Sequence, residues 1–163
     1  MKIKTNKKAP NFKLDSTAPN PFELSKSKNA LIIYFYPKDN TPGCTVETKD
    51  FSKLYKRFKS LKYEIVGISK DDIKSHLGFK KKYKVPFQLL SDEKVQVQKK
   101  YGVWGMKSFL GKKFMGTIRS TIAINKYGKI LRIWPNVRVK NHAQEVLDFV
   151  KSQKQNKSGL NNP

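Results

Sequence analysis

The chain has 163 residues, and 35 lysines and arginines against 12 aspartates and glutamates give it a formal net charge of +23. This length suits one compact domain, and a hydrophobic content of 37% with 12% aromatic residues can form a core, which excludes global disorder. No apolar run approaches the ~20 residues that cross a bilayer, and the first residues lack a secretory-signal pattern, so we expect a cytoplasmic protein without a membrane partner.

The first third of the chain predicts a leader, a strand and a helix. Residues 1–30 are rich in Pro, Asn, Ser and Lys, and short alternating segments at 12–14 and 22–24 predict an irregular leader or a small N-terminal hairpin. Residues 31–36 form a continuous apolar run, typical of a strand buried on both faces. After a loop at 37–43, apolar residues recur every three or four positions through Leu61, which predicts a helix with Cys44 at its N-terminus.

Strands and helices alternate through the middle of the chain. Residues 65–68 predict a second buried strand, and a helix follows from Asp71 and Asp72 through Tyr83. Residues 87–90 predict a short strand, after which Ser91 and Asp92 cap a helix that runs to about Tyr101. Glycines at 102, 105, 111 and 116 then predict a loop, whose aromatic side chains we interpret as packing anchors rather than pocket walls.

The C-terminal part predicts a hairpin and a last helix. Strands at 120–125 and 130–134 flank a turn, Asn141 opens the helix, and a polar segment follows from Lys151. The order of elements predicts an α/β fold of the thioredoxin-like kind, with a central mixed β-sheet flanked by helices and an N-terminal hairpin extension. We expect a single domain at 1–152 and a polar, flexible C-terminal tail at 153–163.

A single cysteine, Cys44, limits the chemistry that the chain can perform. It excludes an intramolecular disulfide and a cysteine-based zinc site, since both need more thiols. His76 and His142 lack ligand spacing, and we interpret both as surface histidines. We therefore expect no metal and no cofactor.

The residues before Cys44 favour a reactive thiol. Helix N-termini and nearby cations stabilise a thiolate, and Pro42 and Gly43 fit an entry turn at which the backbone approaches a ligand closely. The Thr41 hydroxyl lies three residues before the cysteine, and Arg119 would reach the same end of the sheet if strand 120–125 pairs with strand 31–36. Such a site suits attack of a thiolate on the O–O bond of a peroxide. A buried structural cysteine is the alternative.

The sequence around Cys44 resembles the active-site motif of the peroxiredoxins. Its Thr-Pro-Gly-Cys-Thr-Val segment is similar to that of the bacterioferritin comigratory protein (PrxQ) subfamily. The resemblance covers about residues 5–152. Further similar segments lie in the same order and spacing at 8–12, 31–36, 101–109, 116–121 and 141–149.

This resemblance implies a thioredoxin-like fold and thiol-dependent reduction of hydrogen peroxide and organic hydroperoxides. It implies that Cys44 is the peroxidatic cysteine, that Thr41 and Arg119 orient the peroxide and stabilise the thiolate, and that Pro37 shields the pocket from water. Supporting roles fall to Gly43 and Glu47.

The chain departs from the subfamily at one position. Many members carry a resolving cysteine five residues after the peroxidatic one, where this chain has Lys49. An external thiol, such as thioredoxin, glutaredoxin or glutathione, is therefore expected to reduce the oxidised Cys44 in a one-cysteine mechanism. We expect a monomer, with a dimer as the alternative.

Two other functions stay open at this point. One is thiol-disulfide exchange on the same fold, which the missing Cys-x-x-Cys motif disfavours. The other is nucleic-acid binding, which rests on charge alone. Because 31 of the 35 basic residues are lysines and only 4 are arginines, we do not expect specific nucleic-acid recognition.

Overall fold

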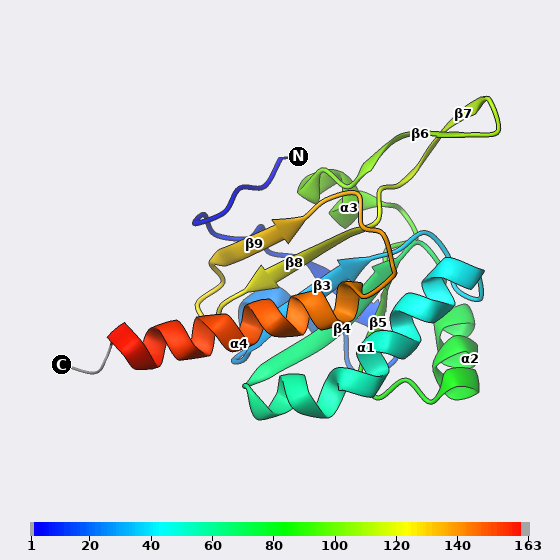
Figure 1. The fold of residues 1–163 in the computed structure, drawn as a ribbon. Helices are drawn as coiled ribbons and strands as arrows, with labels where there is room; N and C mark the ends of the chain where they lie inside the picture. The colour runs from blue at the N-terminus through cyan, green and yellow to red at the C-terminus, as the bar shows by residue number, and fades with distance from the viewer. Residues whose placement is uncertain (1, 161–163) are drawn as a thin grey trace.

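The structure, a computed structural model, describes residues 2–160, with side chains through Lys154. A seven-stranded sheet in the order β2-β1-β5-β4-β3-β8-β9 forms its centre (Figure 1). Its strands are β1 (Lys13–Ser16), β2 (Phe22–Glu23), β3 (Ala30–Phe35), β4 (Tyr63–Ser69), β5 (Gln88–Ser91), β8 (Ser120–Ile124) and β9 (Ile130–Trp134). The helices are η1 (Leu24–Lys26), α1 (Pro42–Ser60), α2 (Ile73–Tyr83), α3 (Gln96–Tyr101) and α4 (His142–Leu160).

Strand β3 lies inside the sheet, parallel to β4 and antiparallel to β8. Its alternate side chains enter two separate cores: Ile32 and Tyr34 pack on one face, and Leu31 and Ile33 on the other. The mixed sheet and the strand buried on both faces confirm the sequence prediction. The antiparallel β1–β2 pair likewise confirms the N-terminal hairpin.

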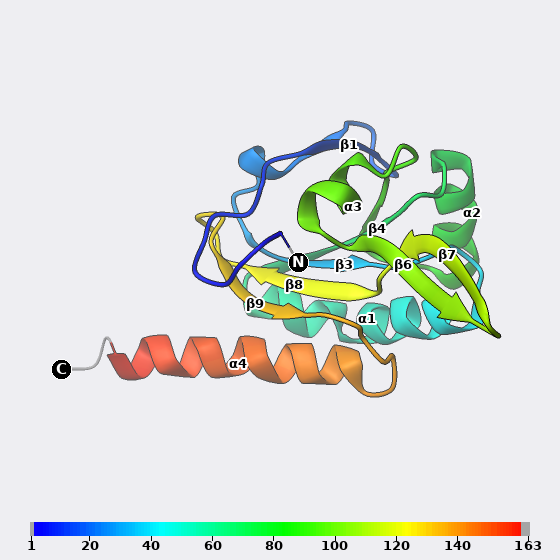
Figure 2. The same cartoon turned by 90° about the horizontal axis from the view of Figure 1, so that it is seen from above.

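Helices cover both faces of this sheet. Helices α1 and α4 lie side by side beneath one face, whereas α3 and the N-terminal segment lie on the other (Figure 2). Within residues 2–160, no helix is both long and apolar enough to cross a bilayer.

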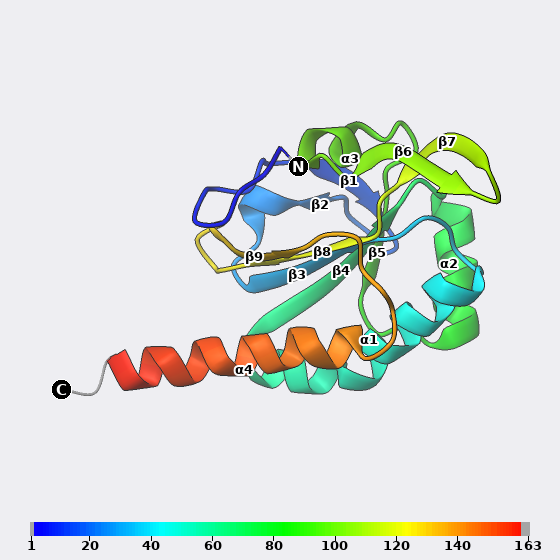
Figure 3. The same cartoon turned by 45° about the horizontal axis from the view of Figure 1, so that its top comes forward.

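The predicted glycine-rich loop is instead a β-hairpin, made of β6 (Trp104–Phe109) and β7 (Lys112–Thr117). Leu110 and Gly111 form its two-residue turn, with φ angles of 51° and 79°. Positive φ at both turn positions matches the right-handed twist of the flanking strands, so the glycine marked a hairpin turn and not an irregular loop. The hairpin extends away from the main sheet, at the end of the molecule where α1 begins (Figures 1 and 3).

Two helix boundaries also differ from the prediction. Helix α3 begins only at Gln96, although Asp92 still caps it, because its carboxylate accepts hydrogen bonds from the N–H groups of Val97 and Gln98 at 3.3 and 2.9 Å. Helix α4 continues through Leu160, so residues 153–160 of the predicted tail are helical. This segment contains lysine and glutamine, which favour helices, and no glycine before Gly159. The last three residues of the predicted tail lie outside the described residues.

Candidate active site

Cys44 lies in the first turn of α1, just after the loop that follows β3. The loop ends at Thr41, which has an extended backbone conformation, and Pro42 starts the helix. Proline suits this position because the first helical N–H has no intrahelical partner. The Thr45 N–H is the donor to the Thr41 carbonyl at 2.9 Å, so the amides of Gly43 and Cys44 precede this first helical hydrogen bond. The Cys44 side chain is therefore buried beside the positive end of the helix dipole.

Arg119 reaches Cys44 from the neighbouring strand. Ser120, the first residue of β8, pairs with Phe35, the last residue of β3, which confirms the predicted adjacency of these strands. The guanidinium Nη2 of Arg119 donates a hydrogen bond to the Cys44 Sγ at 3.3 Å. The contact places a charged hydrogen-bond donor directly against the sulfur.

Glu47, one helical turn after Cys44, holds the other side of this guanidinium. Its Oε1 accepts from Arg119 Nη1 at 2.7 Å, while its Oε2 has no hydrogen-bond partner within residues 2–160. Burial raises the pKa of Glu47 to about 7, although Arg119 opposes that rise. One arginine thus bridges the sulfur and a carboxyl group that is nearly inaccessible to water.

The remaining predicted site residues lie around this pair. A Cβ atom at Gly43 would lie 3.3 Å from Arg119 Nη2, so the absent side chain leaves room for the guanidinium. The Thr41 hydroxyl donates to the Lys38 carbonyl at 2.8 Å, and Pro37 is half-buried at the start of the loop. The structure therefore brings Cys44, Arg119, Glu47 and Gly43 together, while Thr41 and Pro37 belong to the adjoining loop.

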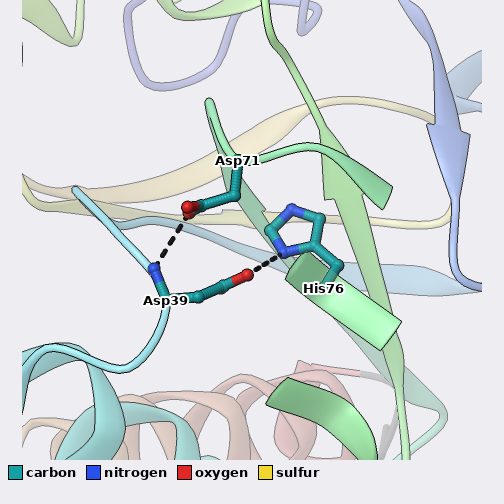
Figure 4. Close-up of side chains that lie close together, drawn as sticks. All are labelled: Asp39, Asp71 and His76. Carbon is teal, nitrogen blue, oxygen red and sulfur yellow. Dashed lines mark hydrogen bonds and ion pairs between the residues drawn. The ribbon is translucent and has the colours of Figure 1, made fainter. Parts of the chain in front are cut away.

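A buried hydrogen-bond network, which no local sequence pattern indicated, holds this loop in place. Asp39 accepts from the Tyr36 hydroxyl at 2.6 Å and from the Ser75 hydroxyl at 2.9 Å. Its Oδ2 lies 2.7 Å from His76 Nδ1 (Figure 4). His76 is fully buried, so its assignment to the surface is wrong. The burial of His76 could have been predicted from its position three residues before Phe79, because this spacing places both side chains on the apolar face of α2.

The same network contains the one group of possible metal ligands found among the described residues. Ligand atoms of Asp39, Asp71 and His76 lie within 4.8 Å of one another. However, His76 Nε2 lies 2.9 Å from the Leu90 carbonyl and Nδ1 faces Asp39, while Asp71 Oδ2 accepts from the Asp39 N–H at 2.9 Å. These hydrogen bonds already use both ring nitrogens, so we assign the group a structural role.

His142 is also buried, which corrects the second surface assignment. Its Nε2 lies 2.8 Å from the Thr121 hydroxyl. Burial lowers the pKa of His142 to about 4, and Arg119 adds to this effect while Glu145 opposes it. His142 is therefore neutral at pH 7, and Thr121 is its polar partner.

The fold and the site together define a thioredoxin-like protein with one buried thiol at a helix N-terminus, paired with an arginine. A family model described as AhpC/TSA family matches residues 5–133. Peroxiredoxin Bcp of Bacillus subtilis (strain 168) is 39% identical over 152 residues, which cover 93% of this chain and 97% of that protein.

Two solved structures show the same relationship. A crystal structure of a cysteine-to-serine mutant of PrxQ from Xylella fastidiosa superposes with a TM-score of 0.87 at 31% identity, covering 93% of this chain and 98% of that one. The bacterioferritin comigratory protein of Xanthomonas campestris, described for its alkyl peroxide reduction activity, gives a TM-score of 0.82 at 34% identity, covering 87% and 91%. The chain belongs to the AhpC/TSA family. Within that family it is a peroxiredoxin of the Bcp/PrxQ group, a thiol-dependent peroxidase whose single cysteine fits a one-cysteine mechanism.

Proposed function

We propose that Cys44 is the peroxidatic residue of this enzyme and that Arg119 is its main catalytic partner. The 3.3 Å contact between Arg119 Nη2 and Cys44 Sγ carries this proposal, because it places a fixed positive charge on the reacting atom. Glu47 acts as a positioning residue through its ion pair with Arg119, and Gly43 leaves the space that the guanidinium occupies. From the preceding loop, Thr41 would help to orient the peroxide and Pro37 would shield the sulfur from water, as the resemblance to the family implies.

The first step oxidises the sulfur. The Cys44 thiolate attacks one oxygen of a hydroperoxide, so that an S–O bond forms and the O–O bond breaks. The sulfur loses two electrons and becomes a sulfenic acid, while the second oxygen leaves as water or an alcohol after taking up a proton. The Arg119 N–H groups stabilise the negative charge as it moves from sulfur to the leaving oxygen.

The second step needs a thiol from outside the chain. The external thiolate attacks the Cys44 sulfur, so that a mixed disulfide forms and water leaves. A second external thiol then releases the Cys44 thiol and carries away the disulfide. Thioredoxin, glutaredoxin and glutathione are the candidate donors. We further propose that the enzyme works as a monomer in the cytoplasm.

Peroxide turnover of the purified protein tests these roles. We expect Cys44→Ser to abolish turnover, and Arg119→Ala to slow the oxidation of Cys44 by about a hundredfold or more. Lys49→Ala is the matched control, because Lys49 is exposed on the same helix and should leave the rate unchanged. Mass spectrometry after one equivalent of peroxide should find a single added oxygen on Cys44.

The reductant is identified by offering thioredoxin, glutaredoxin and glutathione separately. The donor that sustains turnover should also form a mixed disulfide with Cys44 when the second thiol is withheld. Unchanged turnover in the Cys44→Ser protein would overturn the assignment of the peroxidatic residue. Reduction of insulin disulfides without peroxide would instead point to a disulfide-exchange function.

A further inference from the structure

The β6–β7 hairpin exposes apolar side chains that its structural role does not explain. Leu110 is 86% exposed and Phe109 67% exposed, and three further exposed apolar residues lie on the two strands: Met106, Phe114 and Met115. Proteins seldom expose apolar groups close together unless the surface binds something. The earlier interpretation of Phe109 and Phe114 as packing anchors is therefore wrong.

The shape of the hairpin concentrates these groups at a protruding end. Phe109 is the last residue of β6, and Leu110 and Gly111 form the turn, so the hairpin tip, residues 109–111, is its most remote part. The two strands pair only with each other, and the tip extends beyond the main body of the molecule (Figures 1 and 3). A narrow, convex apolar tip of this kind can insert into a deformable surface, which needs no preformed pocket to receive it.

The charges of the hairpin indicate the chemistry of its partner. Lys112 directly follows the tip and pairs with Phe109 across the strands, and Lys113 comes next; both are exposed. The hairpin contains no acidic residue, and neither does the sequence from 94 to 144. A second copy of this chain would bring another net charge of +23 against these lysines, so the partner surface should be anionic.

We propose that the hairpin tip inserts into the interface of an anionic phospholipid bilayer. Phe109 and Leu110 would enter the boundary between headgroups and acyl chains, while Lys112 and Lys113 would contact the headgroup phosphates. This is attachment to a membrane surface, not a span. It revises the expectation of no membrane partner, because neither the length of apolar runs nor the lack of a secretory-signal pattern bears on attachment to a membrane surface.

The place of the hairpin in the chain gives this attachment a consequence for the active site. Strand β7 ends at Thr117, and only Ile118 separates it from Arg119. At the base of the hairpin, Lys107 donates to the Thr117 carbonyl at 2.9 Å. Insertion of the tip would hold the Cys44 site near the bilayer, and, if the proposed function holds, would make lipid hydroperoxides a substrate class.

Vesicle flotation measures this binding without any reference to peroxidase activity. The wild-type protein should float with phosphatidylglycerol-containing vesicles at physiological salt and should stay unbound with pure phosphatidylcholine vesicles. Phe109→Ser with Leu110→Ser should weaken binding by about tenfold or more, because two large apolar groups are removed from the interface. Lys112→Glu with Lys113→Glu should weaken it similarly.

Matched controls lie on α2, away from the hairpin. Leu77→Ser removes another half-exposed apolar side chain, and Lys81→Glu with Lys82→Glu makes the same change in net charge. Both controls should bind vesicles like the wild type. Hydrogen peroxide turnover and circular dichroism should be unchanged in all four variants, which shows that folding and activity persist.

Several results would overturn the proposal. One is that the wild-type protein binds equally well to phosphatidylglycerol-containing and to pure phosphatidylcholine vesicles. Another is that the tip variant binds vesicles as well as the wild type does. A third is that the α2 charge variant loses as much binding as the hairpin charge variant, which would indicate attraction by net charge alone. Retained vesicle binding with a loss of thioredoxin-dependent turnover in the tip variant would assign the tip to a protein partner instead.

Discussion

The guanidinium of Arg119 lies so close to the backbone of Gly43 that a methyl group at that position would stand 3.3 Å from Nη2. That separation is tighter than ordinary van der Waals contact. The arginine is held on its other side by Glu47, so it cannot retreat without lengthening either the ion pair or the contact with Cys44. The rate of peroxide reduction should therefore be sensitive to one methyl group beside the sulfur.

Gly43→Ala tests this sensitivity. We expect the oxidation of Cys44 by hydrogen peroxide to slow by about tenfold, because a displaced donor stabilises the transition state poorly. Stopped-flow kinetics measure the rate, and urea unfolding should show little loss of stability, since alanine favours helices. Gly78→Ala is the control, as nothing lies within 4 Å of its added methyl group. A normal rate in Gly43→Ala would show that the guanidinium has room to adjust.

Glu47→Gln should change how stability depends on pH. Burial raises the pKa of Glu47 from 4.5 to about 7, so between these values the folded protein holds a proton that the unfolded chain has released. Stability from this group therefore falls as the pH rises from about 4.5 to 7. Relative to the wild type, the variant should gain up to about 3 kcal/mol between pH 4.5 and pH 8 in urea unfolding. An identical difference in stability at both pH values would contradict this assignment.

His142→Gln should reveal the opposite slope. The folded-state pKa of His142 is lowered from 6.5 to about 4, so between these values the unfolded chain binds a proton that the folded protein excludes. Stability from this group is complete above about 6.5 and is lost as the pH falls towards 4. The variant should lose that acid-side decrease, about 3 kcal/mol at most. Because Glu47 and His142 oppose each other between pH 4.5 and 6.5, the effect of each group should be clearer in the variant that lacks the other than in the wild type.

Asp39→Asn should destabilise the protein through the loop before Cys44. The change replaces a carboxylate, which accepts hydrogen bonds from Tyr36 and Ser75 and lies 2.7 Å from His76 Nδ1, with an amide that must donate on one side. We expect a loss of about 2 kcal/mol in urea unfolding, because a buried donor or acceptor of the network is left without a partner. Asp72→Asn is the control, because asparagine caps a helix as well as aspartate does. Equal losses in the two variants would argue against a special role for the network.

The sequence predicted the strand at 31–36 and the helix that starts near Cys44 because each is coded by a local pattern. The place of Arg119 also followed, since strand pairing decides which residues meet at one end of a sheet. The buried histidines could not be found in this way. His76 and Asp39 are 37 residues apart, and His142 and Thr121 are 21 apart, so their burial depends on partners that no local pattern reveals. The β6–β7 hairpin was missed because its glycines were interpreted only as breakers, although Leu110 and Gly111 form a regular turn.

The single cysteine also fixes what happens to the enzyme when thiols run short. A chain with a second thiol can convert its sulfenic acid into an internal disulfide, which protects the sulfur from further oxidation. Here the sulfenic acid persists until an external thiol reacts with it. Until a thiol reacts with it, the sulfenic acid can also be oxidised by a second peroxide molecule. That reaction yields a sulfinic acid, which thiols do not reduce. The surviving fraction of active protein would thus record the ratio of thiol to peroxide that the molecule has met.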